Sequence, residues 1–249
     1  VVYERELAKQ GKSRFDFSRE ELYAQIYEFV AANKANFDQQ FRLMGASVDW
    51  NRLTFSLDDK VVGRAYKTFR KMWQEKLIYR GKRLVNLCTF HGTAFADIEV
   101  IHKEDVGNLW YLRYPLTDSS GEVVVATTRP ETMLGDTAVA VHPADPRYKK
   151  LIGRTVHLPL TGREVPIIAD GMVDRQFGTG AVKITPAHDF NDYETAQRHN
   201  LPFINVIDGE GRITAEAPEK YRGLTVKEAR RAVVKDLDEQ GFVAKAEDI

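Results

Sequence analysis

Two polar stretches of this chain gather the side chains that could do chemistry. One is residues 127–132, with the sequence TTRPET, and the other is residues 178–194, which begins GTGAVKITPAHD. Each lies at the end of a run of β-branched residues, where a strand is expected to stop and its side chains can be aimed into a cleft. Together they supply hydroxyl groups, one arginine, one lysine, one histidine and several carboxylates.

In the first stretch, a proline determines where the strand ends. Pro130 favours an extended conformation at Arg129 and cannot continue a central strand. Thr127, Thr128 and Arg129 are therefore displayed at the exit of the strand, with hydroxyl groups beside one guanidinium. Taken alone, this spacing is also typical of a strand-to-turn corner whose threonine hydroxyls bind local backbone groups.

In the second stretch, Gly178 and Gly180 would allow a ligand to approach the backbone closely. They do not indicate a dinucleotide site, because no GxGxxG sequence opens a helix here. A strand follows in which Lys183 and Thr185 point to one side, since side chains alternate along a strand.

Two aspartates follow this strand, and the first of them allows two explanations. Asp189 precedes an expected helix, so it fits an N-cap residue as well as an anchor for a substrate ammonium group. Asp192 follows three residues later, so both carboxylates can face the same cleft. There Asp192 could accept a hydrogen bond from a substrate hydroxyl, and neither carboxylate needs to act as a general base.

The elements that must position these residues change in type along the chain. Apolar residues recur at helical spacing within residues 20–40, with Gly45 placed where that helix could end. A second helix is expected to begin at Ser56, whose hydroxyl can cap it, and to stop at Gly81. Its many basic residues form either a solvated face or a surface that contacts phosphates.

From about residue 84 the pattern changes to short β-type runs separated by turn residues. Helices are expected over about residues 191–199 and from Thr225 onward. We therefore predict an α+β fold in two parts. Residues 1–83 form a helical lead-in, and residues 84–249 form a mixed or antiparallel, barrel-like core with surrounding helices.

Composition narrows the class of protein without choosing a function. The 249 residues contain 36 basic and 36 acidic side chains, which argues against binding nucleic acid by bulk charge but permits local basic patches. No apolar run approaches the roughly 20 residues of a membrane span, and the N-terminal residues lack the apolar segment of a secretory signal. We expect a cytoplasmic protein with no membrane partner.

The single cysteine, Cys88, cannot form an intrachain disulfide and suits a reducing compartment. Cys88 and His91 have the spacing of half a zinc site, but no second pair of ligands follows at a suitable distance. We therefore expect neither a structural metal nor a cofactor.

The two polar stretches, at this separation, resemble the editing domain of class I aminoacyl-tRNA synthetases, most closely that of the valyl enzymes. TTRPET is followed by MLGDT at residues 133–137, as in valyl enzymes, whereas isoleucyl enzymes resemble TTTPWT and leucyl enzymes TTRPDT at this place. The resemblance covers nearly the whole chain, including GASVDW at residues 45–50. It implies the inserted connective-polypeptide domain, since neither a HIGH nor a KMSKS sequence is present.

This resemblance implies roles for ten residues. The group at the reacting centre would be Lys183, Thr185, Asp189 and Asp192, and the substrate-binding group would be Thr127, Thr128, Arg129, Glu131, Phe177 and His188. Arg129 and Phe177 would contact the terminal adenosine of tRNA. Asp189 would bind the α-ammonium group of the amino acid, and Asp192 its side-chain hydroxyl.

The implied activity is an aminoacyl-tRNA deacylase that hydrolyses Thr-tRNA(Val), with the tRNA acceptor end and the rest of the synthetase as partners. Water would attack the ester, and backbone groups or Lys183 would stabilise the oxyanion. Three alternatives stay open: a module that binds the acceptor end without catalysis, a structural insertion, and the editing domain of an isoleucyl or leucyl relative.

Overall fold

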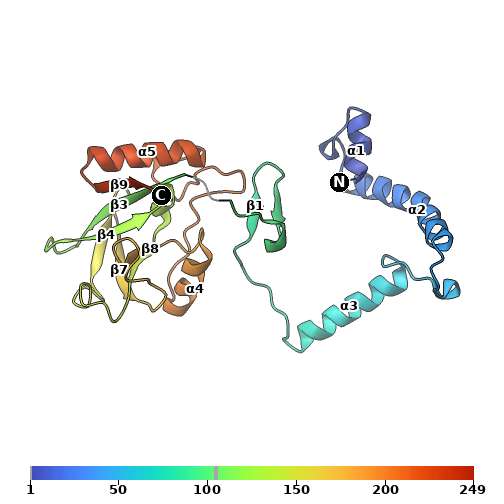
Figure 1. Ribbon diagram of the computed structural model, residues 1–249, viewed down its shortest axis with the longest axis horizontal. Coiled ribbons are helices and arrows are strands. Elements are labelled where there is room, and N and C mark those ends of the chain that lie inside the picture. Colours follow the sequence, from blue (N-terminus) through green and yellow to red (C-terminus); the bar gives the residue numbers. More distant parts are fainter. Residues whose placement is uncertain (1, 104–105) are drawn as a thin grey trace. The chain divides into compact units, whose positions relative to one another are not determined.

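The structure, a computed structural model, describes residues 2–103 and 106–249. The chain divides into two compact units, Val1–Arg80 and Gly81–Ile249 (Figure 1). The sequence-based proposal divides the chain after residue 83.

The first unit is helical. Its elements are α1 (Val2–Lys9), η1 (Arg14–Asp16), α2 (Arg19–Leu43), η2 (Trp50–Arg52) and α3 (Asp59–Gln74). A capping box starts α2, because the Ser18 hydroxyl accepts from the backbone N–H of Glu21 and the Glu21 carboxylate accepts from that of Ser18. Helix α2 ends at Leu43, and Gly45, the glycine predicted to follow the helix, lies two residues later in the left-handed region with φ of 75°.

Both predicted ends of the second helix were wrong. Helix α3 begins at Asp59 because Asp58, not Ser56, is its N-cap residue, and the Asp58 carboxylate binds the backbone N–H of Phe55 at 3.0 Å. The helix ends at Gln74, well before Gly81, and Lys76 then adopts a left-handed φ of 58°. A non-glycine residue supplies the reversal, so the sequence carries no glycine signal for it.

The second unit contains nine strands and two α-helices among its described residues. The strands are β1 (Asn86–Cys88), β2 (Thr93–Phe95), β3 (Asn108–Pro115), β4 (Glu122–Thr127), β5 (Ala138–Val141), β6 (Thr155–Leu158), β7 (Arg163–Ala169), β8 (Ala181–Ile184) and β9 (Val243–Asp248). The helical elements are η3 (Asp97–Glu99), η4 (Pro130–Gly135), α4 (Phe190–His199), η5 (Glu219–Tyr221) and α5 (Val226–Glu239).

The strands form a hairpin and two larger sheets. The hairpin is β1–β2, the three-stranded sheet has the order β4-β3-β9, and the four-stranded sheet has the order β6-β7-β5-β8. All pairs are antiparallel except β5 with β7. The predicted α+β class with mixed strands is confirmed, although the described strands do not close into a barrel.

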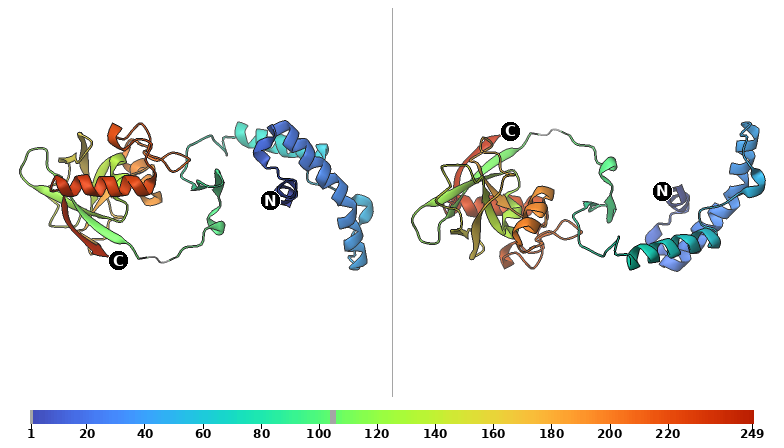
Figure 2. Two further views of the ribbon diagram at one scale, coloured as in Figure 1. Left: turned by 90° about the horizontal axis from the view of Figure 1, so that it is seen from above. Right: turned by 90° about the horizontal axis from the view of Figure 1, so that it is seen from below.

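The core lies between these sheets and is sealed by α5. Ala229, Val233 and Leu237, spaced by four residues, form a fully buried stripe along this helix. Helix α5 lies beside β9 (Figure 1, Figure 2). It also contacts η4. The packing of α5 therefore fixes the turn that follows β4.

The topology brings the two polar stretches together. Strand β4 ends at Thr127 and β8 ends at Ile184, and the two strands contact each other. Gly178 makes a close approach possible just before β8, because its φ is 58° and a Cβ there would lie 2.8 Å from the Cβ of Ala126 in β4. The space predicted for a ligand beside Gly178 is thus occupied by a strand.

Candidate functional site

A cavity of about 270 Å³ lies where the two polar stretches meet. It is lined by every predicted site residue except Glu131, namely Thr127, Thr128, Arg129, Phe177, Lys183, Thr185, His188, Asp189 and Asp192. Six further residues complete the wall: Leu109, Ala126, Thr132, Met172, Val182 and Asn191. The cavity thus joins strand ends from both sheets with the start of α4.

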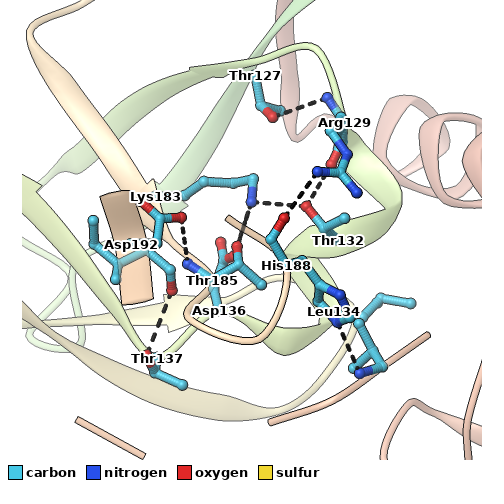
Figure 3. Close-up of polar contacts among 12 residues, drawn as sticks. Thr127, Arg129, Thr132, Leu134, Asp136, Thr137, Lys183, Thr185, His188 and Asp192 are labelled. Atoms are coloured by element: carbon cyan, nitrogen blue, oxygen red, sulfur yellow. Dashed lines mark hydrogen bonds and ion pairs between the residues drawn. The ribbon is translucent and has the colours of Figure 1, made fainter. Parts of the chain in front are cut away.

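Arg129 connects the first stretch to the second. Its Nη1 donates to the backbone oxygen of His188 at 3.0 Å, while its backbone N–H donates to the Thr127 hydroxyl at 3.1 Å (Figure 3). Thr127 is buried, whereas Thr128 and Arg129 are exposed at the rim. The local backbone bond expected of a strand-to-turn corner is therefore present at Thr127, within the wall of a cavity.

The Lys183 ammonium group sits in the floor and is nearly buried. Its Nζ donates to Oγ1 of Thr132 at 2.9 Å, to Oδ1 of Asp136 at 3.2 Å and to Oγ1 of Thr185 (Figure 3). An ammonium group carries three hydrogens, so these three oxygens engage all of them. Stabilisation of an oxyanion by Lys183, one of the two sources expected from sequence, would require one of these bonds to break.

The two threonine hydroxyls around Lys183 also use their hydrogens in hydrogen bonds within the protein. Thr185 donates to Oδ1 of Asp136 at 2.5 Å, and Thr132 donates to the backbone oxygen of Arg129 at 2.9 Å. Each hydroxyl has a single hydrogen, so Thr132 and Thr185 can offer a ligand only lone pairs. The floor of the cavity therefore accepts hydrogen bonds and does not donate them.

Asp136 is the centre of this buried cluster, and sequence reasoning missed it. The side chain is fully buried, and its Oδ2 accepts from the Tyr114 hydroxyl at 2.7 Å. Burial raises the pKa of Asp136, while the Lys183 ammonium and the Thr185 hydroxyl oppose that rise. A usable signal was present, because a carboxylate within the apolar run from Met133 to Val141 must find a buried partner.

Asp192 supplies a second buried carboxylate, 6% exposed. Its Oδ2 accepts from the backbone N–H of Thr185 at 2.8 Å. Burial raises the pKa of Asp192 to about 6, and the Thr185 N–H works against this rise. At neutral pH the group is therefore mostly ionised and acts as an acceptor.

Asp189 is the N-cap residue of α4, as one of its two explanations predicted. Its Oδ1 accepts from the backbone N–H groups of Asn191 at 2.9 Å and Asp192 at 3.2 Å. The side chain also lines the cavity and is exposed. Capping and ligand binding are compatible here, because both capping bonds use the same carboxylate oxygen.

His188 is held as a neutral ring. Its Nε2 accepts from the backbone N–H of Val206 at 3.0 Å. Burial, together with the nearby Arg129 and Lys183 charges, lowers the pKa of His188 to about 4. This ring nitrogen therefore fixes the chain at Val206 and is not a proton donor at neutral pH.

Glu131 does not reach the cavity, so the expected direct contact with a substrate is not supported. The side chain is fully buried on the other side of η4, where its carboxylate binds Arg230 of α5. Phe177, by contrast, is 59% exposed and lies at the rim, where a flat ring could stack.

The structure adds little to the half zinc site at the β1–β2 hairpin. Cys88 Sγ lies 3.2 Å from Nδ1 of His91. In the part of the chain that the structure describes, no group of three or more His, Cys, Asp or Glu side chains could hold a metal ion. Nor does any helix in that part combine the length and apolar composition of a membrane span.

Comparison with known proteins gives matches along nearly the whole chain. The family model described as tRNA synthetases class I (I, L, M and V) matches residues 1–246. The chain is 51% identical over 247 residues to the valine–tRNA ligase of Dechloromonas aromatica, covering 99% of this chain and 26% of that protein. It is 52% identical over 242 residues to that of Thermotoga maritima, covering 97% of this chain and 28% of that protein.

The chain thus spans about a quarter of the length of the curated relatives it matches. Among solved structures, a ternary complex of Agrobacterium radiobacter K84 agnB2 LeuRS, tRNA and LeuAMS aligns at 18% identity with a TM-score of 0.46. That alignment covers 92% of this chain and 38% of the other.

Proposed function

Since the chain belongs to the class I tRNA synthetases of the isoleucyl, leucyl, methionyl and valyl group, we propose that it is an editing domain that hydrolyses Thr-tRNA(Val). Residues 84–249 would form the editing core, and residues 1–83 would connect it to the remainder of a valyl-tRNA synthetase. The half-identity to valine–tRNA ligases over 97–99% of the chain favours the valyl branch over the isoleucyl and leucyl ones.

The observation that carries this proposal is the hydrogen-bond direction in the cavity floor. Thr132, Thr185 and Asp192 present acceptors, and the hydrogens of the two hydroxyls and of the Lys183 ammonium group are already used. A threonyl group brings an ammonium and a hydroxyl, both of which donate. A valyl group lacks the hydroxyl and would leave a buried acceptor unpaired, at a cost of about 1–3 kcal/mol.

Such a cavity would solve a problem that a synthetic site cannot. A pocket shaped for valine cannot strongly reject threonine, which has the same shape and adds only a hydroxyl, and valyl enzymes are themselves the standard example. A second site that requires the hydroxyl would accept threonine and reject valine, which lacks it. The unpaired-acceptor cost corresponds to roughly 5- to 150-fold protection of the correct product.

In the proposed reaction, the oxygen of water bonds to the ester carbonyl carbon and the bond from that carbon to the ribose oxygen breaks. The ribose oxygen gains the proton that water loses, so the products are free threonine and tRNA(Val). The hydroxyl lone pairs of Thr132 and Thr185 in the cavity floor would orient the attacking water. Positioning of the water would therefore supply much of the rate acceleration. Because the Lys183 hydrogens are engaged, we assign oxyanion stabilisation to backbone N–H groups. Lys183 then fixes the two hydroxyls.

The remaining roles follow from position. Asp189 would bind the α-ammonium group, and Asp192 would accept the hydrogen bond of the threonine hydroxyl. Arg129 and Phe177, exposed at the rim, would contact the terminal adenosine of the tRNA acceptor end. His188 would support the wall through its bond to Val206.

The test is deacylation by the 249-residue chain of Thr-tRNA(Val), with Val-tRNA(Val) and Val-tRNA(Ile) as controls. We expect threonine release well above the spontaneous rate and little release of valine from its cognate tRNA. Binding of the acceptor end without hydrolysis would instead favour a binding module. Neither binding nor hydrolysis would leave a structural insertion as the better explanation.

A further inference from the structure

One carboxylate of the TTRPET stretch faces away from the cavity and is bound by a helix far along the chain. Oε1 and Oε2 of Glu131 accept from Nη2 and Nε of Arg230 at 2.7 and 2.8 Å. The glutamate is fully buried, and the arginine side chain is 37% exposed. A two-bond arginine–carboxylate contact of this kind fixes orientation as well as distance.

Glu131 lies in η4 between two cavity residues, Arg129 and Thr132. The turn is short and closed by a bond from the Thr132 N–H to the Arg129 oxygen at 3.1 Å. Any shift of the Glu131 backbone must therefore move Thr132, which holds Lys183, and Arg129, which reaches His188.

The other end of the contact is firmly anchored. Helix α5 begins with a capping box in which the Thr225 hydroxyl and the Glu228 carboxylate bind each other's backbone N–H groups. Its stripe of Ala229, Val233 and Leu237 is fully buried in the core. Arg230 thus projects from an element that is fixed independently of the cavity.

We propose that Arg230 is a positioning residue which, through Glu131, holds Arg129 and Thr132 in the geometry needed for deacylation. The inference rests on the proposed function and deepens it. Arg230 lies outside the cavity. It would affect tRNA binding through Arg129 and the rate of turnover through Thr132.

A purely structural pair and a positioning pair differ in one respect that can be measured. Removing Arg230 leaves the buried Glu131 charge unpaired, so Arg230→Ala would lose stability under either explanation. Replacing both partners by apolar side chains of similar size often leaves stability unchanged. The informative variant is therefore Glu131→Leu/Arg230→Met, which keeps the packing and removes the directed bonds.

The experiment compares this double variant with wild type by single-turnover deacylation of Thr-tRNA(Val) and by thermal unfolding. We expect an unchanged unfolding midpoint, a raised half-saturating concentration and a lowered maximal rate, with a combined loss on the order of 10- to 100-fold. Arg230→Lys, which keeps the charge but not the planar two-bond contact, should lie between the two.

Asp236→Asn is the matched control on the same helix. Asp236 is also buried and paired, with Lys220 at 2.6 Å and with Tyr221, but neither of these hydrogen bonds involves a residue of η4. This variant should lose stability and keep the deacylation constants of wild type. Wild-type kinetics in the double variant, or an equal kinetic loss in Asp236→Asn, would overturn the positioning role.

A binding measurement separates this inference from the proposed function. The probe is an acceptor-stem minihelix ending in a non-hydrolysable 3′-threonylamide. If wild type fails to release threonine, the deacylase proposal falls, and weaker probe binding by the double variant still supports positioning of Arg129. Equal probe binding by wild type and the double variant in that case would overturn the positioning role as well.

Discussion

At the scale of single residues, the proposed selection of threonine over valine depends on the Asp192 carboxylate and on its protonation state. Replacing it with leucine should slow Thr-tRNA(Val) hydrolysis much more than any residual Val-tRNA(Val) hydrolysis, because only threonine offers a hydroxyl to this carboxylate. The ratio of the two deacylation rates measures the effect. An unchanged ratio would place threonine selection at Thr185 or in the Thr127–Thr128 corner.

The raised pKa of Asp192, about 6, predicts opposite pH responses of activity and stability. Deacylation should fall as pH drops through about 6, because protonation removes the negative charge and turns one carboxylate oxygen from an acceptor into an O–H donor. The folded state, however, binds the Asp192 proton more tightly than the unfolded state does. The free energy of unfolding should therefore fall as pH rises from about 4 to 6, by roughly 3 kcal/mol in total.

The stability comparison needs the variant Asp192→Asn, because His188 titrates in the same range with the opposite sign. The pKa of His188 is lowered to about 4, so its burial favours folding at higher pH. Urea unfolding of wild type and Asp192→Asn between pH 4 and 7 isolates the aspartate. Parallel curves would contradict the assignment of this titration to Asp192.

Arg129 and Lys183 should fail in different ways. Arg129→Ala should raise the half-saturating tRNA concentration, since the guanidinium lies exposed at the rim. Lys183→Ala should lower the maximal rate, since it removes one of the two hydrogen bonds that hold each of the hydroxyls of Thr132 and Thr185. Single-turnover kinetics distinguish the two, and identical profiles would show that one of these roles is misplaced.

At the scale of elements, the close approach of Gly178 to β4 sets the rim of the cavity. Gly178→Ala should cost about 2–5 kcal/mol, combining a left-handed backbone with a clash against Ala126. Gly162→Ala is the control, because its φ is 70° but nothing lies within 4 Å of the added Cβ. Chemical denaturation should show the smaller loss of about 1–2 kcal/mol for the control.

Local sequence patterns predicted the boundaries of the elements around the site better than the contacts between those elements. Pro130 and Pro186 mark the ends of β4 and β8, and Thr225 with Glu228 marks the start of α5. Asp136 and Arg230 were missed, because their partners lie on other elements and no local pattern encodes those pairings. The start of α3 was predicted at Ser56 and lies at Asp59, after Asp58, because serine and aspartate both suit an N-cap and the residue type alone does not separate them.

At the scale of the whole molecule, the cavity belongs to one of the two units. All its lining residues lie between positions 109 and 192, within Gly81–Ile249. Residues 81–249 produced alone should therefore unfold cooperatively and keep the maximal deacylation rate. The half-saturating tRNA concentration should rise, because the basic residues of α3 are removed. A lost maximal rate in a folded fragment would show that the first unit completes the site.

The cluster around Lys183 determines when the free energy of desolvating and orienting its polar groups is spent. Its ammonium, two hydroxyls and the Asp136 carboxylate are desolvated and oriented when the chain folds. Under the proposed function, an arriving aminoacyl end would therefore meet dipoles that need no reorganisation, and turning them would add nothing to the barrier to reaction. The free energy needed to orient these groups would then be supplied once, during folding, and not again in each round of the proposed reaction.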